Sequence, residues 1–130
     1  MPIQTRLFVR CAMLYLVLAF AVGIAMAIDP AWRILWPTYL HLLVVGWLTQ
    51  LIFGVAFWLF PRASRERKRG REGFVWVSLV TLNAGMVLRM AGEPFDLGRA
   101  DGLVLVASAL CHLIAVLAFT LNVWPRVSAR

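Results

Sequence analysis

Charged side chains are scarce in this sequence, and long stretches have none. Asp and Glu together number 6 of 130 residues, while 62% of the chain is hydrophobic and the mean hydropathy is +0.83. Ordinary soluble domains are roughly half apolar. A helix needs about 20 apolar residues to cross the ~30 Å hydrocarbon core of a bilayer. This composition excludes an ordinary soluble domain and predicts a membrane protein.

Four stretches are long and apolar enough to span a bilayer. Backbone N–H and C=O groups must pair with one another in lipid, which favours helices for a chain of this length. Short connections leave little room for another domain. We therefore predict one all-α transmembrane domain, residues 1–130, folded as an integral membrane four-helix bundle. The expected helices cover residues 7–28, 39–60, 74–90 and 102–124.

Cysteines are few, and acidic residues are missing from the deep parts of the expected spans. Both features reduce the number of possible functions. Cys11 and Cys111 form no Cys-x-x-Cys pair, so the sequence contains no zinc motif and no covalent heme attachment motif. Their expected depths in the membrane differ, so we expect small packing residues rather than a disulfide. The expected spans hold no deep Asp or Glu, which argues against a proton-coupled carrier.

The basic residues are unevenly placed, and this asymmetry predicts orientation. The net charge is +7, and ten of the 13 Lys and Arg residues belong to one expected membrane face: Arg6, Arg10, six in the 61–72 loop, Arg126 and Arg130. The other three, Arg33, Arg89 and Arg99, belong to the opposite face. Positive loops stay in the cytoplasm. We predict N-in/C-in orientation in a bacterial inner (cytoplasmic) membrane, as a multi-pass protein. We therefore expect the lipid bilayer to be the partner of this protein, and we do not expect it to bind nucleic acid.

Two histidines stand inside apolar segments, and buried ionisable groups are costly in hydrocarbon. His41 is readable as a heme or metal ligand, as an interfacial hydrogen-bonding group, or as a proton-handling group. His112 lies deeper. Counted from the inner helix ends, the two differ by seven residues, or roughly 10 Å in depth, which disfavours an intrachain pair without excluding it. Arg89 ends the third helix on the side of His41, where it can either snorkel or pair with heme propionates.

A family resemblance rests on residues 41–62, HLLVVGWLTQLIFGVAFWLFPR. This stretch resembles the second transmembrane helix of the catalytic subunit of heme-copper oxidases, closest to the branch of high-affinity oxidases and nitric oxide reductases. Small stand-alone four-helix proteins are similar to the whole chain, including LNAG at 82–85 and LNVWP at 121–125. The resemblance implies that His41 is the axial ligand of heme b. It also makes Arg89 a candidate for the propionates, without alignment by motif.

The chain lacks the later helices that carry the remaining family histidines, so we do not expect it to reduce oxygen or nitric oxide alone. The expected function is that of a cytochrome b-like, heme-b-binding membrane protein. Its role would be electron transfer in a respiratory chain, heme or gas sensing, or support of a respiratory oxidase or nitric oxide reductase. His41 and, secondarily, His112 would bind the heme iron, within one chain or across a homodimer. The alternatives are a non-catalytic structural or assembly subunit of a respiratory complex and a small metal-handling membrane protein.

Overall fold

The computed structural model describes residues 1–60, 72–94 and 99–128, and every element in these ranges is helical. The elements are α1 (Ile3–Ile28), η1 (Pro30–Leu35), α2 (Trp36–His41), η2 (Leu42–Thr49), α3 (Gln50–Leu59), α4 (Glu72–Gly92) and α5 (Arg99–Ser128). Four segments within them are long and apolar enough to cross a membrane: Ile3–Ile28, Pro30–Leu59, Glu72–Gly92 and Gly102–Val127. The prediction of an all-α chain with four spans is confirmed at this level.

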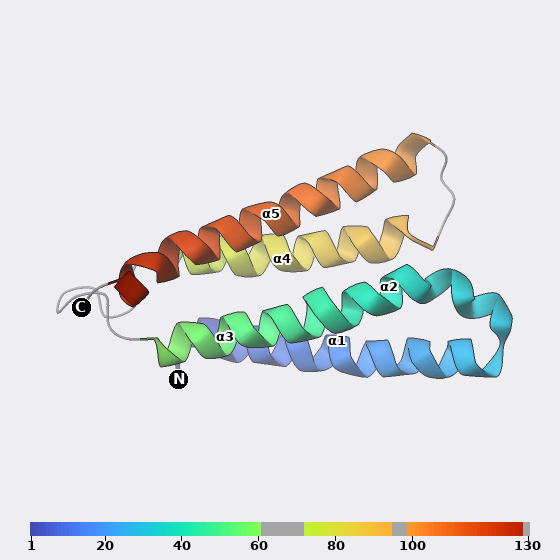
Figure 1. The fold of residues 1–130 in the computed structure, drawn as a ribbon, viewed down its shortest axis with the longest axis horizontal. Helices are drawn as coiled ribbons and strands as arrows, with labels where there is room; N and C mark the ends of the chain where they lie inside the picture. The colour runs from blue at the N-terminus through green and yellow to red at the C-terminus, as the bar shows by residue number, and fades with distance from the viewer. Residues whose placement is uncertain (61–71, 95–98, 129–130) are drawn as a thin grey trace.

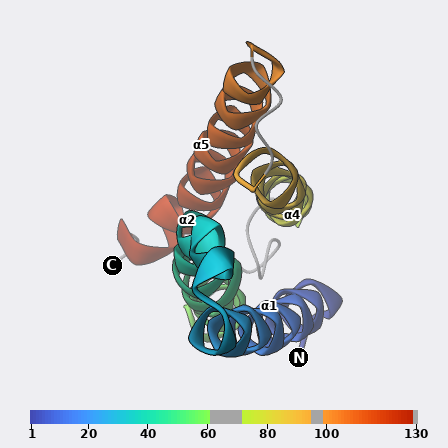
Figure 2. The ribbon, with the colours of Figure 1, turned by 90° about the vertical axis from the view of Figure 1, so that its right-hand side faces the viewer.

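The helices form two antiparallel pairs (Figure 1). α1 lies beside the continuous α2–η2–α3 segment, and α4 lies beside α5. Seen from its end, α2 lies between α1 and the α4–α5 pair (Figure 2). The start of α1 and the end of α5 are at one end of the bundle, which we call the terminal end; the α1–α2 connection marks the opposite, distal end. An even number of spans puts both termini on one side, whereas the direction of insertion stays a prediction. Most of the basic 61–72 loop that carries that prediction falls outside the described residues.

Prolines account for the end of α1 and the start of α2, but Pro125 does not end α5. Asp29 is extended, with φ −134° and ψ 119°, as expected for a residue before proline, so α1 ends where predicted. Pro37 lies in the first turn of α2, where a missing N–H costs nothing. The prediction that the last helix ends at residue 124 is wrong, because α5 passes through Pro125 to Ser128. A proline near a helix end disturbs few hydrogen bonds, so the last turn survives.

The remaining predicted bounds were too short, except that the second span ends at Leu59, one residue before its predicted end. The first helix begins at Ile3 and the third extends from Glu72 to Gly92. The second begins at Trp36 after a turn of 3₁₀-helix, and its middle, Leu42–Thr49, is a π-helix. Each π turn holds an extra residue, so the helix faces before and after it are rotated relative to a regular α-helix. Nothing in the apolar sequence marks this change of hydrogen bonding.

Packing divides the bundle into layers along its length. Near the terminal end an apolar cluster joins all four spans and includes Phe8, Phe57, Leu82 and Phe119. The Phe53 and Phe119 rings stack with centroids 4.0 Å apart. A smaller cluster of Tyr15, Ala19, Leu42 and Met86 lies toward the distal end. The core is therefore continuous along the bundle but thinner toward the distal end.

Polar side chains between the helices link the pairs, as predicted for interhelical contacts. The Tyr15 hydroxyl donates to Asn83 Oδ1 at 3.0 Å, and Gln50 Nε2 donates to the same oxygen at 3.4 Å. Gly46 and Gly54 permit α1 to approach closely, because a Cβ on either would lie 2.8 Å from Tyr15 or Phe8. The Cys11 and Cys111 thiols are both free.

Candidate functional site

His41 is the last residue of α2, and its imidazole is held at one nitrogen. Nδ1 lies 2.9 Å from Pro37 O and 2.9 Å from Glu93 Oε1. A carbonyl and a carboxylate both accept hydrogen bonds, so Nδ1 must carry the hydrogen. In the neutral ring the lone pair then resides on Nε2, to which the described residues offer no hydrogen bond. The His41 side chain is 30% exposed, so the ring is not enclosed in the core.

Glu93 joins the second span to the third. Its side chain is 6% exposed, and Oε1 also lies 3.6 Å from Arg89 Nη1. Its other oxygen, Oε2, accepts a hydrogen bond of 2.9 Å from the Thr38 hydroxyl. Both carboxylate oxygens therefore have partners, which fixes the orientation of the group. A buried acid in a membrane protein ordinarily has such partners, because an isolated charge there is expensive.

Glu93 was not among the site residues predicted from the sequence, because it falls between the third and fourth predicted helices. Its N–H donates to Arg89 O at 3.0 Å, which extends the last turn of α4 and turns the carboxylate toward α2. The available signal was spacing. Arg89 and Glu93 are four residues apart, and Thr38 and His41 are three apart, so each pair shares one helix face. What no spacing in one helix reveals is that these two faces meet.

His112 occupies the contact between α4 and α5. Its ring lies against Gly85, where a Cβ would come within 2.5 Å of Cδ2 and 2.6 Å of Nε2. One turn earlier on α5, the Ser108 hydroxyl donates to Gly85 O at 2.8 Å. His112 Nε2 is buried and has no hydrogen-bond partner among the described residues. Such an orphaned nitrogen is rare in native cores.

Arg89 follows Gly85 by one turn of α4, on the same side of the helix. Besides its contact with Glu93, it has a buried Nε with no hydrogen-bond partner in the described part of the chain. The structure thus brings His41 and Arg89 together through Glu93, and His112 on α5 contacts Gly85, one turn before Arg89 on α4. We call His41, Glu93, Arg89 and His112 the distal polar cluster.

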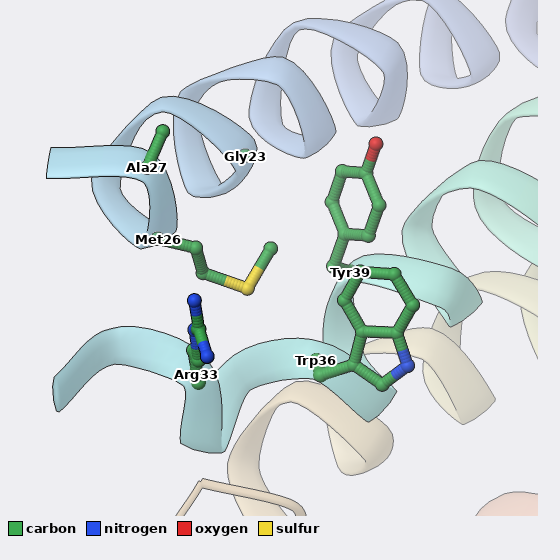
Figure 3. Close-up of a pocket in the computed structure, with 6 residues that line it drawn as sticks. All are labelled: Gly23, Met26, Ala27, Arg33, Trp36 and Tyr39. Carbon is green, nitrogen blue, oxygen red and sulfur yellow. The ribbon is translucent and has the colours of Figure 1, made fainter. Parts of the chain in front are cut away.

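Arg33, Trp32 and Trp36 line two hollows that do not include Arg89. Arg33 and Trp36 border a pocket of about 420 Å³ between α1 and the start of the second span (Figure 3). Tyr39 stands over Gly23 in this pocket, with its ring 3.3 Å from where a glycine Cβ would be. None of the distal polar cluster lines it. Trp32 instead lines an apolar hollow, also of about 420 Å³, with Thr38, Leu42 and Met90.

The donor set can be compared with what different metals require. Within residues 1–60, 72–94 and 99–128, no three His, Cys, Asp or Glu side chains are grouped to hold a metal ion. Structural zinc takes four protein ligands, and catalytic zinc three. One or two imidazoles fit a metal that brings its own equatorial ligands, as heme iron does. The Arg89 guanidinium matches carboxylates such as propionates in kind, whereas His112 Nε2 lies against Gly85.

Comparison of the chain with protein-family models, with curated proteins and with solved structures found no match in any of the three. The resemblance of residues 41–62 to the oxidase helix therefore stays a prediction.

Proposed function

We propose that this chain is a heme-b-binding integral membrane protein in which His41 is the axial ligand. The observation that carries this proposal is the state of the His41 imidazole. Nδ1 is engaged by two acceptors at 2.9 Å each, so Nε2 is the basic nitrogen. Ligating histidines nearly always donate their other ring N–H to a carboxylate or a carbonyl, which fixes both tautomer and ring orientation.

Two further groups support the same ligand. His112 Nε2 is a buried nitrogen without a hydrogen-bond partner in the described residues, and the ring would have to turn away from Gly85 to bind an iron ion. Arg89 has a partner-free buried Nε on the third helix, and guanidinium groups match carboxylates such as propionates. Bound heme would supply reversible one-electron chemistry at its iron. The chain itself would orient the His41 ring, exclude water with its apolar spans, and neutralise propionate charge through Arg89.

The proposed setting follows from charge distribution. Ten of 13 basic residues belong to the termini and the 61–72 loop, which supports a cytoplasmic location for both in a bacterial inner membrane. The distal polar cluster would then face the periplasmic half of the bilayer. Electron transfer, heme or gas sensing, or service to a respiratory oxidase or nitric oxide reductase all fit a heme in this position. Catalysis by this chain alone is not proposed.

The deciding experiment is the absorption spectrum of the purified protein, expressed with ample heme. We expect a Soret band and sharp α and β bands on reduction. Both should disappear in His41→Ala and weaken or shift in His112→Ala. Thr81→Val is the matched control, because the Thr81 hydroxyl bonds only to carbonyls of its own helix, at 2.7 Å to Val77 O and 3.5 Å to Ser78 O.

A colourless wild-type protein that is folded and inserted would overturn the proposal. It would instead favour the structural or assembly subunit, in which the distal polar cluster simply holds the second and third spans together. Gel filtration of the same sample, before and after heme addition, would tell a heme shared across a homodimer from one held in a single chain. A homodimer would show two chains per heme.

A further inference from the structure

We infer that Glu93 is a positioning residue for His41, one that sets how strongly the imidazole donates electrons to a bound iron. This inference rests on the proposed function and goes beyond it, because it assigns a role to a residue that the sequence pattern placed outside the site. Its basis is the 2.9 Å contact between Glu93 Oε1 and His41 Nδ1. Glu93 contacts the Nδ1 edge of the ring and not the Nε2 edge, so it would act on a bound iron through His41.

The geometry makes the carboxylate a rigid partner. The Thr38 hydroxyl holds Oε2 at 2.9 Å, and the Glu93 side chain is only 6% exposed. The residue is tied to α4 through its N–H, while both Thr38 and His41 belong to α2. The carboxylate cannot turn away from Nδ1 without also losing Thr38. Its position relative to the imidazole is therefore set by the packing of two helices.

The two acceptors at Nδ1 differ in charge, and this difference gives Glu93 its role. The Pro37 carbonyl is neutral and belongs to the same helix as His41. The Glu93 carboxylate is an ionised acceptor, and hydrogen bonds to ionised groups are shorter and roughly twice as strong. Pulling the Nδ1 hydrogen toward a negative charge raises the basicity of Nε2. A more basic ligand favours the ferric over the ferrous ion, so the midpoint potential falls.

Arg89 moderates this effect without cancelling it. Its Nη1 lies 3.6 Å from the same oxygen that contacts His41, beyond hydrogen-bond distance. The arrangement joins His41, Glu93 and Arg89 in a row across α2 and α4.

The experiment compares Glu93→Gln with Thr38→Val in the purified heme protein. Glu93→Gln keeps an oxygen acceptor and the side-chain size but removes the charge. Thr38→Val removes the other hydrogen bond of the same carboxylate and leaves the His41 contact. We expect Glu93→Gln to raise the midpoint potential in a redox titration and to weaken heme affinity about 10-fold or more. Thr38→Val should leave the midpoint potential near that of the wild type.

The paramagnetic resonance spectrum of the ferric protein provides a second readout that a purely structural role would not move. Its g values report ligand basicity and should change in Glu93→Gln and stay unchanged in Thr38→Val. If Glu93→Gln does not insert, Glu93→Asp replaces it, because the shorter side chain keeps the charge but withdraws it from Nδ1. The midpoint potential should again rise.

The outcomes separate the two proposals. A Glu93→Gln protein that retains heme with unchanged midpoint potential, affinity and g values overturns the inference and leaves His41 as a heme ligand. Equal shifts in Glu93→Gln and Thr38→Val also overturn it, since they would reflect loosened packing between α2 and α4. A wild-type protein that binds no heme overturns the proposed function, and the role of Glu93 with it.

Discussion

The imidazole of His112 lies against Gly85 so closely that a methyl group on the glycine would come within 2.6 Å of Nε2. The contact decides how near α4 and α5 approach each other at the level of the distal polar cluster. Because Ser108 donates to the Gly85 carbonyl at 2.8 Å, the two helices are hydrogen-bonded at the same point. A side chain at position 85 would disturb both the contact with the His112 ring and the hydrogen bond from Ser108.

Gly85→Ala should displace His112 and destabilise the bundle by about 1–3 kcal/mol, the usual cost of overpacking. Unfolding in detergent, followed by circular dichroism, would measure the loss. Gly73→Ala is the matched control on the same helix, since a Cβ there meets nothing within 4 Å. Equal stability of the two variants would show that the α4–α5 contact adapts more freely than its geometry implies.

Arg126 should be essential for stability at the terminal end. Its side chain is buried, and Nη2 donates to Phe57 O at 3.0 Å and to Phe60 O at 2.6 Å, at the end of α3. The guanidinium also packs over the Phe57 ring at 5.4 Å. Arg126→Ala would leave two carbonyls at the helix end without this donor. We expect a loss of about 2–4 kcal/mol, from hydrogen bonds to a charged group and lost packing.

Arg10→Gln is the control for Arg126, because Arg10 is also at the terminal end but its side chain is exposed. It should cost less than about 0.5 kcal/mol. Thermal unfolding of both variants in the same detergent makes the comparison. A similar small cost for Arg126→Ala would mean that water or lipid replaces its hydrogen bonds.

Tyr15 and Asn83 should be energetically coupled across α1 and α4. Tyr15→Phe removes the hydroxyl that donates to Asn83 Oδ1 at 3.0 Å and leaves the ring packing in place. Interhelical hydrogen bonds in membrane proteins contribute on average about 0.6 kcal/mol. A double-mutant cycle with Asn83→Ala should give a coupling energy near that value. Additive effects would show that the hydroxyl and the amide stabilise the bundle independently.

Deleting one residue of the π-helix should break the link between His41 and Glu93. Removing Leu48, which is 43% exposed, would take one extra residue out of Leu42–Thr49. The preceding helix face would then turn by roughly 100°, the rotation per residue of an α-helix. We expect loss of heme absorbance with insertion retained, whereas Leu48→Ala should keep the spectrum. Full absorbance in the deletion would show that the π-helix moves elsewhere to preserve the site.

The sequence predicted the coarse fold because that part of the problem depends on solvent. Uncharged runs of sufficient length become spans in hydrocarbon whatever they pack against. The proline at position 30 likewise ends α1 by restricting the residue before it. Pro125 could not be interpreted in the same way, because its effect depends on position in the helix and on Arg126, whose buried contacts with α3 accompany the continued turn.

The candidate site likewise contains residues that the sequence identifies and one that it does not. His41, His112 and Arg89 stand out in the sequence because ionisable groups are conspicuous in apolar stretches. Glu93 does not, because it follows a helix end and adjoins a proline, where polar residues are ordinary. Its burial follows from the angle at which α4 meets α2. The contacts that join these two helices at this point are those of Glu93 with Thr38 and His41.

From its sequence alone, this protein was determined to be a helical chain with four membrane-length spans and two histidines that need partners. Only the tertiary structure decided who those partners are: Glu93 for His41, and a bare glycine surface for His112. The physical reason is the distance along the chain over which each effect acts. Hydropathy and proline geometry act within one segment, whereas the pairing of buried charges depends on how separate helices turn their faces toward one another.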